Sequence, residues 1–555
     1  MHKKTQSWSL SSASAPERSA SCNLLCATLK MSDKIDPELD GLECLYTWQV
    51  EIDSGSHRKI RQNLLEKVQQ SPLHYQATYF NILAFVLHLE GETEMALEYL
   101  CKAEEALKED KRDETDFIVT YSSFAWIHHH LRNQKDMERY RDKVRSISRE
   151  GAAATVHGEK GWSFLKLGSM FFERSKESFE KALELNPENP SYNMGYGVVL
   201  YRIEDLDKKH EIKPEYSAAV KQLRKTLSLD SGYSEAMTLL ALKVQKYDER
   251  EADELIVKAL VLSPDVPHII AYVDTYLRFI SSNKRLLEIL KSALFQTPTS
   301  VFLNHQAGLC YKKKYMQLIK SGRRDEAAAD VKECIRFLSE AVRLDPSNTN
   351  AMMNLAEAYA EDHQLQKAID IFKKALVQSP NSDILNHQTG LCYMKKYIQL
   401  IKSGRRDEAA AHVKKCIRFL SEAVRLDPSN TNAMMNLAEA YAEDHQLQRA
   451  EETFTNLIKE CQLKEKDKQH CHFIYGKFLF FKRNDEDRSV EQYKEAYKIQ
   501  VYSGDRKKAG ERLRQVARHK RGQMSNEIWA FLADEDEKSN KGGDLASEFS
   551  QKVQL

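Results

Sequence analysis

The strongest constraint on the fold is a block of sequence that occurs twice. Residues 304–368 recur at 386–450, 82 residues later, with only six differences. Each copy holds a long segment with apolar residues at helical spacing, the polar phrase Lys-Ser-Gly-Arg-Arg-Asp-Glu and a further helical run. Duplication on this scale is typical of solenoids, in which each repeat packs only on its neighbours.

A shorter period inside the block indicates pairs of antiparallel helices. From Met352 to Pro380 the small and large apolar residues follow the tetratricopeptide pattern, with small residues where two backbones approach. Proline, which stops a helix, recurs after second helices at Pro264, Pro298, Pro346, Pro380 and Pro428. These prolines are 34 or 48 residues apart. The pattern predicts an all-α tetratricopeptide-repeat superhelix, an α-solenoid, in which some pairs carry 14 extra residues within 312–329 and its copy.

The repeats account for most of the 555 residues. We assign residues 31–535 to the superhelix, because helical patterns follow one another to about Asp534. Residues 1–30 are rich in serine and alanine, and residues 536–555 in lysine, serine, glycine and aspartate. Such segments bury too little apolar surface to fold, so both are predicted to be disordered. Whether the first 30 residues are made in the cell is left open, since Met31 offers an alternative start.

Composition excludes several classes of partner. The net charge is +1, so no global basic field indicates DNA, and any nucleic-acid site must be local. Ten cysteines show no paired spacing, which favours a reducing compartment. No apolar run approaches the roughly 20 residues needed to span a bilayer, so no membrane partner is expected.

The sequence contains no recognisable catalytic motif. A phosphate-binding loop, a dinucleotide-binding glycine fingerprint and a nucleophile elbow are all missing. Two clusters invite a metal interpretation, residues 128–130 (three histidines) and Cys461 with residues 470–472. Consecutive helical residues point in different directions, and neither spacing matches a zinc site. We therefore predict no catalytic residue, no metal and no cofactor.

What remains is a curved array suited to binding. A peptide or protein surface is one credible ligand, and single-stranded RNA is the other, because it needs a local positive groove with aromatic side chains. Trp162, Lys166 one helical turn later and Arg202 on a following helix provide both features. Further candidates lie downstream at Tyr233, Tyr272, Tyr276, Arg278 and His305.

The chain resembles the interferon-induced proteins with tetratricopeptide repeats from about Met31 to about Gln500. Six phrases carry the resemblance: Leu45-Tyr-Thr-Trp48, Asn81-Ile-Leu-Ala-Phe-Val86, Gly161-Trp-Ser-Phe-Leu-Lys166, residues 187–202 (with Pro-Glu-Asn-Pro at their start), residues 296–311 and His472-Phe-Ile-Tyr-Gly-Lys477. The resemblance implies a cytosolic, interferon-induced antiviral protein. It also implies binding of the 5′ end of foreign single-stranded RNA, a triphosphate or an incompletely methylated cap, and self-association or pairing with related repeat proteins.

The resemblance also implies roles for individual residues. Trp162 is similar to the aromatic residue at the cap base, and Lys166 and Arg202 resemble the pair that neutralises the 5′ phosphates. Residues that hold the following nucleotides correspond to Tyr233, Arg278, His305 and Gln306. The phrase that precedes the first copy favours His305 and Gln306 over their duplicates His387 and Gln388.

Alternatives stay open at several positions. Trp162 occupies the standard tryptophan position of the repeat, where core packing alone accounts for it. Phe172 stands where the family has a tyrosine, and Ser191 where cap-binding members can have an acidic residue, so the choice between triphosphate and cap is open. Where the family has an arginine on an early helix, this chain has Asn63, with Arg61 nearby and Lys67 four residues later, and a downstream phosphate-contacting arginine is replaced by Ala271. The alternative function is a repeat scaffold that binds protein partners in innate immune signalling.

Overall fold

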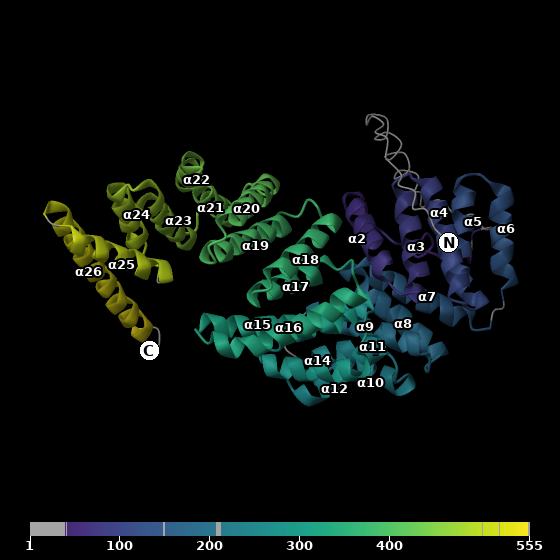
Figure 1. The fold of residues 1–555 in the computed structure, drawn as a ribbon. Helices are drawn as coiled ribbons and strands as arrows, with labels where there is room; N and C mark the ends of the chain where they lie inside the picture. The colour runs from purple at the N-terminus through teal and green to yellow at the C-terminus, as the bar shows by residue number, and fades with distance from the viewer. Residues whose placement is uncertain are drawn as a thin grey trace. The chain divides into compact units, whose positions relative to one another are not determined.

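The computed structural model describes residue 39 and residues 41–147, 150–206, 212–501, 503–520 and 522–552. Within these residues every regular element is a helix, so the predicted all-α solenoid is confirmed. The chain divides into two compact units, residues 1–303 and residues 304–555, and Figure 1 shows the helices of both. The extension predicted over residues 1–30 lies outside the described residues.

The first unit is built from antiparallel helix pairs joined by short turns. Its α-helices are α2 (His57–Gln70), α3 (Leu73–Leu89), α4 (Thr93–Glu109), α5 (Ile118–His130), α6 (Gln134–Ser146), α7 (Ala152–Leu167), α8 (Phe172–Leu185), α9 (Pro190–Leu206), α10 (Ala218–Leu229), α11 (Ser234–Val244), α12 (Glu249–Leu262), α13 (Pro267–Phe279) and α14 (Asn283–Gln296). Short 3₁₀ turns lie at η1 (Ser54–Ser56), η2 (Glu114–Phe117) and η3 (Ser169–Phe171).

Two glycines let α7 and α9 close on one phenylalanine of α8. A methyl group on Gly161 would lie 2.9 Å from ring atoms of Phe179, and one on Gly195 would lie 2.2 Å away. Phe179 is fully buried between them. Because only glycine allows this approach, the first helices of neighbouring pairs come close together. This packing sets the spacing of α7 and α9, which carry Lys166 and Arg202.

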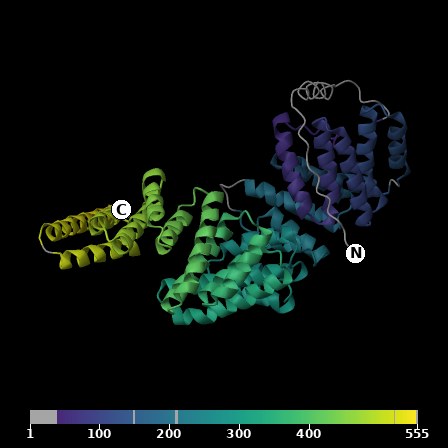
Figure 2. The same ribbon diagram turned by 45° about the horizontal axis from the view of Figure 1, so that its top comes forward.

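The second unit continues the same design. Its helices are α15 (Val301–Lys320, which begins at the end of the first unit), α16 (Arg324–Leu344), α17 (Thr349–Glu361), α18 (Leu365–Gln378), α19 (Asp383–Lys402), α20 (Arg406–Leu426), α21 (Thr431–Glu443), α22 (Leu447–Glu460), α23 (Glu465–Phe478), the π-helix η4 (Leu479–Arg483), α24 (Glu486–Lys498), α25 (Gly504–His519) and α26 (Gln523–Lys552). Figure 2 shows the same ribbon from a second direction.

The duplicated block folds twice in the same way. Helices α16, α17 and α18 begin 82 residues before α20, α21 and α22. The 14 extra residues predicted in the elongated pairs form helix rather than loop, since α15 and α16 have 20 and 21 residues whereas α17 and α18 have 13 and 14. Gly322 and Gly404 make the tight turns of the two long pairs with φ of 81° and 77°, a conformation that glycine adopts without strain.

The predicted helix ends are confirmed except at the C-terminus. Helices α12, α14, α16, α18 and α20 each end two residues before the proline that was taken as their stop signal. The last helix was expected to end near Asp534, but α26 continues to Lys552. Contacts explain part of this extension, because Asp536 accepts a hydrogen bond from the Tyr497 hydroxyl at 2.5 Å and pairs with Arg514 at 3.4 Å. The boundary expected near Asp534 is therefore too early.

Candidate functional site

A cavity of about 460 Å³ opens within the first unit, among the first helices of successive pairs. Its walls come from α2, α3, α7, α9, α11 and α13, with Phe172 from α8. The lining residues are Lys67, Ser71, Pro72, Tyr75, Tyr79, Leu165, Lys166, Gly168, Phe172, Val198, Arg202, Glu235, His268 and Tyr272. Most walls are aromatic or apolar with a few convergent polar groups, as is usual for ligand sites.

Three cationic side chains face this cavity, Lys67, Lys166 and Arg202. Among the described residues none of them forms an ion pair with a carboxylate. Lysine and arginine side chains without an ion pair usually extend into solvent, each apart from the others. These three instead line the same partly enclosed cavity. The arrangement favours an anionic ligand, because its charge would satisfy all three at once.

Lys166 is held by aromatic rings rather than by a carboxylate. Its ammonium nitrogen lies 4.2 Å from the ring centre of Tyr75, 5.2 Å from that of Tyr79 and 5.1 Å from that of Trp162. These distances are within the range of cation–π attraction. The rings orient the ammonium group without neutralising its charge, so it remains available to a ligand.

Trp162 lies behind this layer of the wall. It is only 5% exposed, and it packs against Tyr75 and edge-on against Phe179, with ring centres 4.8 Å and 5.3 Å apart. Its indole Nε1 donates to Ser191 Oγ at 3.3 Å. The structure therefore places Trp162 as a supporting wall beside Lys166. Its expected stacking role against a ligand base stays a prediction.

The opposite wall carries one carboxylate and one histidine. Glu235 is 8% exposed and accepts a hydrogen bond from the Tyr75 hydroxyl at 3.1 Å. Burial lowers the pKa of His268 below its usual range, so its ring is neutral near pH 7. Arg202 Nη2 donates to the Tyr272 hydroxyl at 3.5 Å, a long bond. With three cations against one carboxylate, the cavity carries a positive local charge.

A second cavity of about 470 Å³ adjoins the first and shares Pro72, Glu235 and His268 with it. Tyr233 lines this second cavity, together with Ser191. Burial, followed by the charge of Glu235, raises the pKa of Tyr233 to about 12. Its hydroxyl therefore stays protonated and can donate a hydrogen bond at neutral pH.

Besides Trp162, three predicted residues are not part of these cavities. Arg278 has a side chain that is 76% exposed and pairs with Asp274 on its own helix. His305 and Gln306 belong to the second unit, where His305 Nε2 lies 3.4 Å from the Asn354 amide nitrogen. The same contact recurs between His387 and Asn436 at 3.0 Å. The histidine therefore contacts an asparagine of a neighbouring helix in both copies. The predicted RNA-binding roles of all seven residues remain predictions.

The cavity residues that sequence reasoning missed include Tyr75, Tyr79, Glu235 and His268. Tyr75 and Tyr79 are four residues apart on α3, so they share one helix face, and this spacing was a usable signal. Glu235 and His268 follow Arg202 at intervals of 33 residues, which is about one repeat. Glu235 and His268 are each the second residue of their helix, α11 and α13, whereas Arg202 lies toward the end of α9.

The other sequence clusters form structural contacts. His88 Nε2 lies 2.9 Å from His130 Nδ1, and His470 Nδ1 lies 2.8 Å from Asp505. Among the described residues no group of three or more histidine, cysteine or acidic side chains is placed to hold a metal ion. A search of the same residues finds no helix with the length and apolarity to cross a membrane.

Comparison with known proteins identifies the family. Tetratricopeptide-repeat models match residues 159–208 and 318–387. Protein IFIT1 homolog B of Homo sapiens is 31% identical over 403 residues, which cover 69% of this chain and 84% of that protein. The chain belongs to the family of interferon-induced proteins with tetratricopeptide repeats. The resemblance inferred from the sequence phrases is therefore confirmed.

Two further matches extend this family assignment. Antiviral innate immune response effector IFIT1 of Homo sapiens is 30% identical over 365 residues, 62% of this chain and 76% of that protein. Interferon-induced protein with tetratricopeptide repeats 2 of Homo sapiens is 25% identical over 527 residues, 91% and 93% of the two chains. Solved structures of the family include the human IFIT1 dimer with m7Gppp-AAAA, at 26% identity and a TM-score of 0.39 over 84% of this chain and 99% of that one.

Proposed function

We propose that this family member is an antiviral RNA-binding protein of the cytoplasm that captures the 5′ end of foreign single-stranded RNA and acts by binding, not by catalysis. The ligand end is a triphosphate or an incompletely methylated cap. The observation that carries the proposal is the convergence of Lys67, Lys166 and Arg202, all without carboxylate partners among the described residues, on one cavity of about 460 Å³.

The chemistry of the cavity matches a polyphosphate. Lys166 supplies a compact ammonium charge, and Arg202 presents a planar fork that can bind two phosphate oxygens. Hydrogen bonds between charged partners are about twice as strong as neutral ones. Tyr79 and Phe172 provide ring surfaces for a sugar or a base. Since phosphate contacts carry no sequence information, this site would select RNA ends and tolerate any base order.

The neighbouring cavity offers room for a cap base beyond the phosphates. Ser191 and Tyr233 line it, and both carry hydroxyls that can donate or accept hydrogen bonds. An acidic residue at position 191 would bind the donors of a guanine edge more strongly than serine does. The site would therefore have room for a triphosphate or for a cap, and binding measurements with both RNA ends decide which one it prefers.

The test compares RNA of one sequence with three 5′ ends: triphosphate, unmethylated cap and hydroxyl. Wild-type protein should bind the first two and not the third. Lys166→Ala and Arg202→Ala should each weaken triphosphate binding by roughly 10- to 100-fold, since each removes a charged hydrogen bond of about 1.5–3 kcal/mol.

The matched control is Lys284→Ala, because the Lys284 side chain on α14 is 88% exposed and far from the cavity lining. It should bind triphosphate RNA like wild type. Circular dichroism should show unchanged helix content in all three variants. Equal affinity of the wild-type protein for the hydroxyl and triphosphate ends would refute the proposal.

A further inference from the structure

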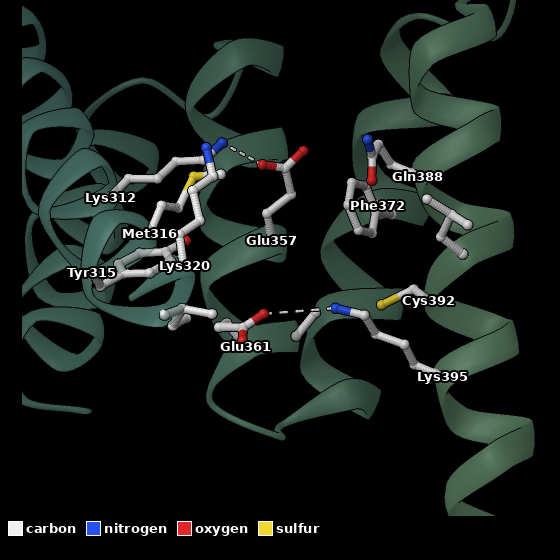
Figure 3. Close-up of a pocket in the computed structure, with 13 residues that line it drawn as sticks. Lys312, Tyr315, Met316, Lys320, Glu357, Glu361, Phe372, Gln388, Cys392 and Lys395 are labelled. Carbon is white, nitrogen blue, oxygen red and sulfur yellow. Dashed lines mark hydrogen bonds and ion pairs between the residues drawn. The ribbon is translucent and has the colours of Figure 1, made fainter. Parts of the chain in front are cut away.

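The second unit holds a cavity of its own, of about 540 Å³, where the first copy of the duplicated block meets the second. Helices α15 and α19 form its sides, and α17 and α18 form its floor (Figure 3). The apolar lining consists of Tyr315, Met316, Ile319, Ala360, Phe372, Leu391 and Cys392. A volume of this size suits a drug-sized ligand or a few peptide side chains.

The helices that follow the second copy of the block can be compared with those that form this cavity. Helix α17 has the same sequence as α21, and Phe372 of α18 corresponds to Phe454 of α22. What differs is the next first helix, α19 after one copy and α23 after the other. A glycine sets the register between these two helices, because Gly390 packs against Leu420 of α20 and Gly476 against Tyr493 of α24.

In that register Cys392 of α19 corresponds to Phe478 of α23. Phe478 fills the space beside Phe454, with ring centres 5.6 Å apart, and Tyr475 adds a second ring at 5.3 Å. At the same two positions α19 has Cys392 and Thr389. The cavity is therefore the space that an aromatic side chain occupies one repeat later.

The charged rim of the cavity is largely self-neutralised. Glu357 pairs with Lys312, and Glu361 lies 3.7 Å from Lys395 (Figure 3). Lys320 also lines the cavity and, within the described part of the chain, has no carboxylate partner. A ligand that meets this rim therefore encounters one unpaired positive charge.

Gln388 is the remaining polar residue of the lining. Its amide group makes no hydrogen bond to another described side chain or backbone group. A side-chain amide both donates and accepts hydrogen bonds, so it can pair with one peptide unit of an extended chain. Peptide-binding grooves combine such backbone contacts with pockets for side chains.

We propose that this cavity binds a peptide segment of a partner protein in which an aromatic residue is followed closely by an acidic residue. The aromatic side chain enters the space beside Phe372 and Cys392, where the following repeat places Phe478. The acidic side chain pairs with Lys320, and Gln388 binds the peptide backbone. Apolar walls and the glutamates of the rim disfavour RNA here, so this site is separate from the proposed RNA site in the first unit.

Fluorescence polarisation with three synthetic peptides tests the proposal. The first carries the core of residues 478–481 with acidic flanks, Gly-Glu-Phe-Leu-Phe-Phe-Asp-Gly. In the second the three phenylalanines are serine, and in the third the two acidic residues are lysine. Saturable binding of the first peptide, weaker binding of the third and none of the second is the expected result. No saturable binding of the first peptide, or equal binding of the first and third, would overturn the proposal.

Variants of the full chain locate the binding site. Cys392→Phe should fill the cavity as Phe478 does in the next repeat and abolish binding of the first peptide. Lys320→Ala should weaken that binding about threefold, whereas Lys402→Ala, its counterpart 82 residues later, should leave it unchanged. Unchanged peptide affinity in both Cys392→Phe and Lys320→Ala would exclude this cavity.

Two control measurements distinguish loss of peptide binding from misfolding and from a change at the RNA site. Thermal unfolding followed by circular dichroism shows whether Cys392→Phe is folded, and Lys320→Ala, an exposed change, tests the site if it is not. Both variants should bind 5′-triphosphate RNA like wild type. Loss of RNA binding along with peptide binding would show that the peptide occupies the RNA site and would overturn the assignment.

Discussion

The ammonium nitrogen of Lys166 lies 4.2 Å above the ring of Tyr75, whose hydroxyl is hydrogen-bonded to Glu235 at 3.1 Å. Tyr75 thus contacts both a cation of the cavity, Lys166, and its carboxylate, Glu235. The ring keeps Lys166 in place, and the hydroxyl keeps Glu235 oriented. We therefore expect the proposed affinity for phosphate to depend on the balance between the two charges that Tyr75 connects.

Removing the carboxylate should shift that balance toward phosphate. Glu235→Gln keeps an acceptor for the Tyr75 hydroxyl but removes a negative charge from the lining. Repulsion of the ligand falls, so triphosphate RNA should bind more tightly, by about tenfold, or ~1.4 kcal/mol. Fluorescence polarisation at constant salt measures the change.

The control for this variant is Glu251→Gln, which removes a carboxylate paired with Arg224 outside the cavity. It should not alter RNA affinity. A weaker complex with Glu235→Gln would contradict the repulsion argument and would show that the carboxylate accepts a hydrogen bond from the RNA.

Lys67 should contribute a phosphate contact of its own. In binding single strands, each phosphate contact adds about 0.7 to the slope of log affinity against log salt concentration. Lys67→Ala should therefore make the slope for triphosphate RNA shallower by about 0.7, together with a loss of affinity. Titrations at several salt concentrations provide the slope, and Lys59→Ala on the exposed face of the same helix should leave it unchanged. An unaltered slope in Lys67→Ala would remove this lysine from the site.

Glu159 should make stability depend on pH. It is buried beside Thr78, whose hydroxyl donates to it at 2.9 Å, and burial raises the pKa of this carboxyl to about 7. A raised carboxyl pKa means that the folded state holds the proton more tightly than the unfolded state. Its contribution is therefore full at acid pH and is lost as pH rises through 7.

Glu159→Gln should remove that dependence. Between pH 5 and pH 8 the free energy of unfolding of the wild type should fall by about 2–3 kcal/mol more than that of the variant. Urea unfolding at the two pH values measures the difference. Glu340→Gln, at an exposed carboxylate on α16, should behave like wild type. Parallel pH curves for wild type and Glu159→Gln would mean that the Glu159 carboxyl titrates alike in both states.

The long pair α19–α20 should depend on one glycine. A methyl group on Gly390 would lie 2.7 Å from Leu420 Cγ, closer than such atoms approach. Gly390→Ala should destabilise the protein by about 1–3 kcal/mol, because the helices must separate to admit it. Gly504→Ala is the matched control, since its methyl group meets no atom within 4 Å. Equal melting temperatures of the two variants would contradict the tight packing.

The fold was predictable from the sequence because its signals are local. A proline after each second helix and the alternation of small and large apolar residues lie within single repeats, so α17 and α18 were foreseen. The extent of α26 was not, because Asp536 is held by Tyr497 and Arg514 from other helices. The sequence pattern around Asp536 gives no sign of these two partners, which lie on other helices.

The site was predictable only in part. Lys166 and Arg202 were found and do line one cavity, but Glu235 and His268 were missed. Glu235 and His268 share a repeat position, but glutamate and histidine share no chemistry that would mark it, and only the packing of the helices brings both to Arg202. Arg278 was predicted as a site residue but lies outside the cavity. Asp274, one turn earlier on the same helix, already supplies its carboxylate partner.

The duplicated block also poses a problem of folding register. Phe372 and Phe454 each follow one copy of the block, so α23 could be mispaired with α18 while 82 residues are looped out. Such near-degenerate pairings are a characteristic hazard of repeat proteins. The chain differs directly after the two copies, where Glu451 pairs with Arg483 and Arg488 at 2.5 Å and 2.6 Å, and the corresponding residue is the buried Ile369. A mispaired chain would leave both arginines without their carboxylate. The pairing of α24 with α22, rather than with α18, is thus favoured by one charged side chain.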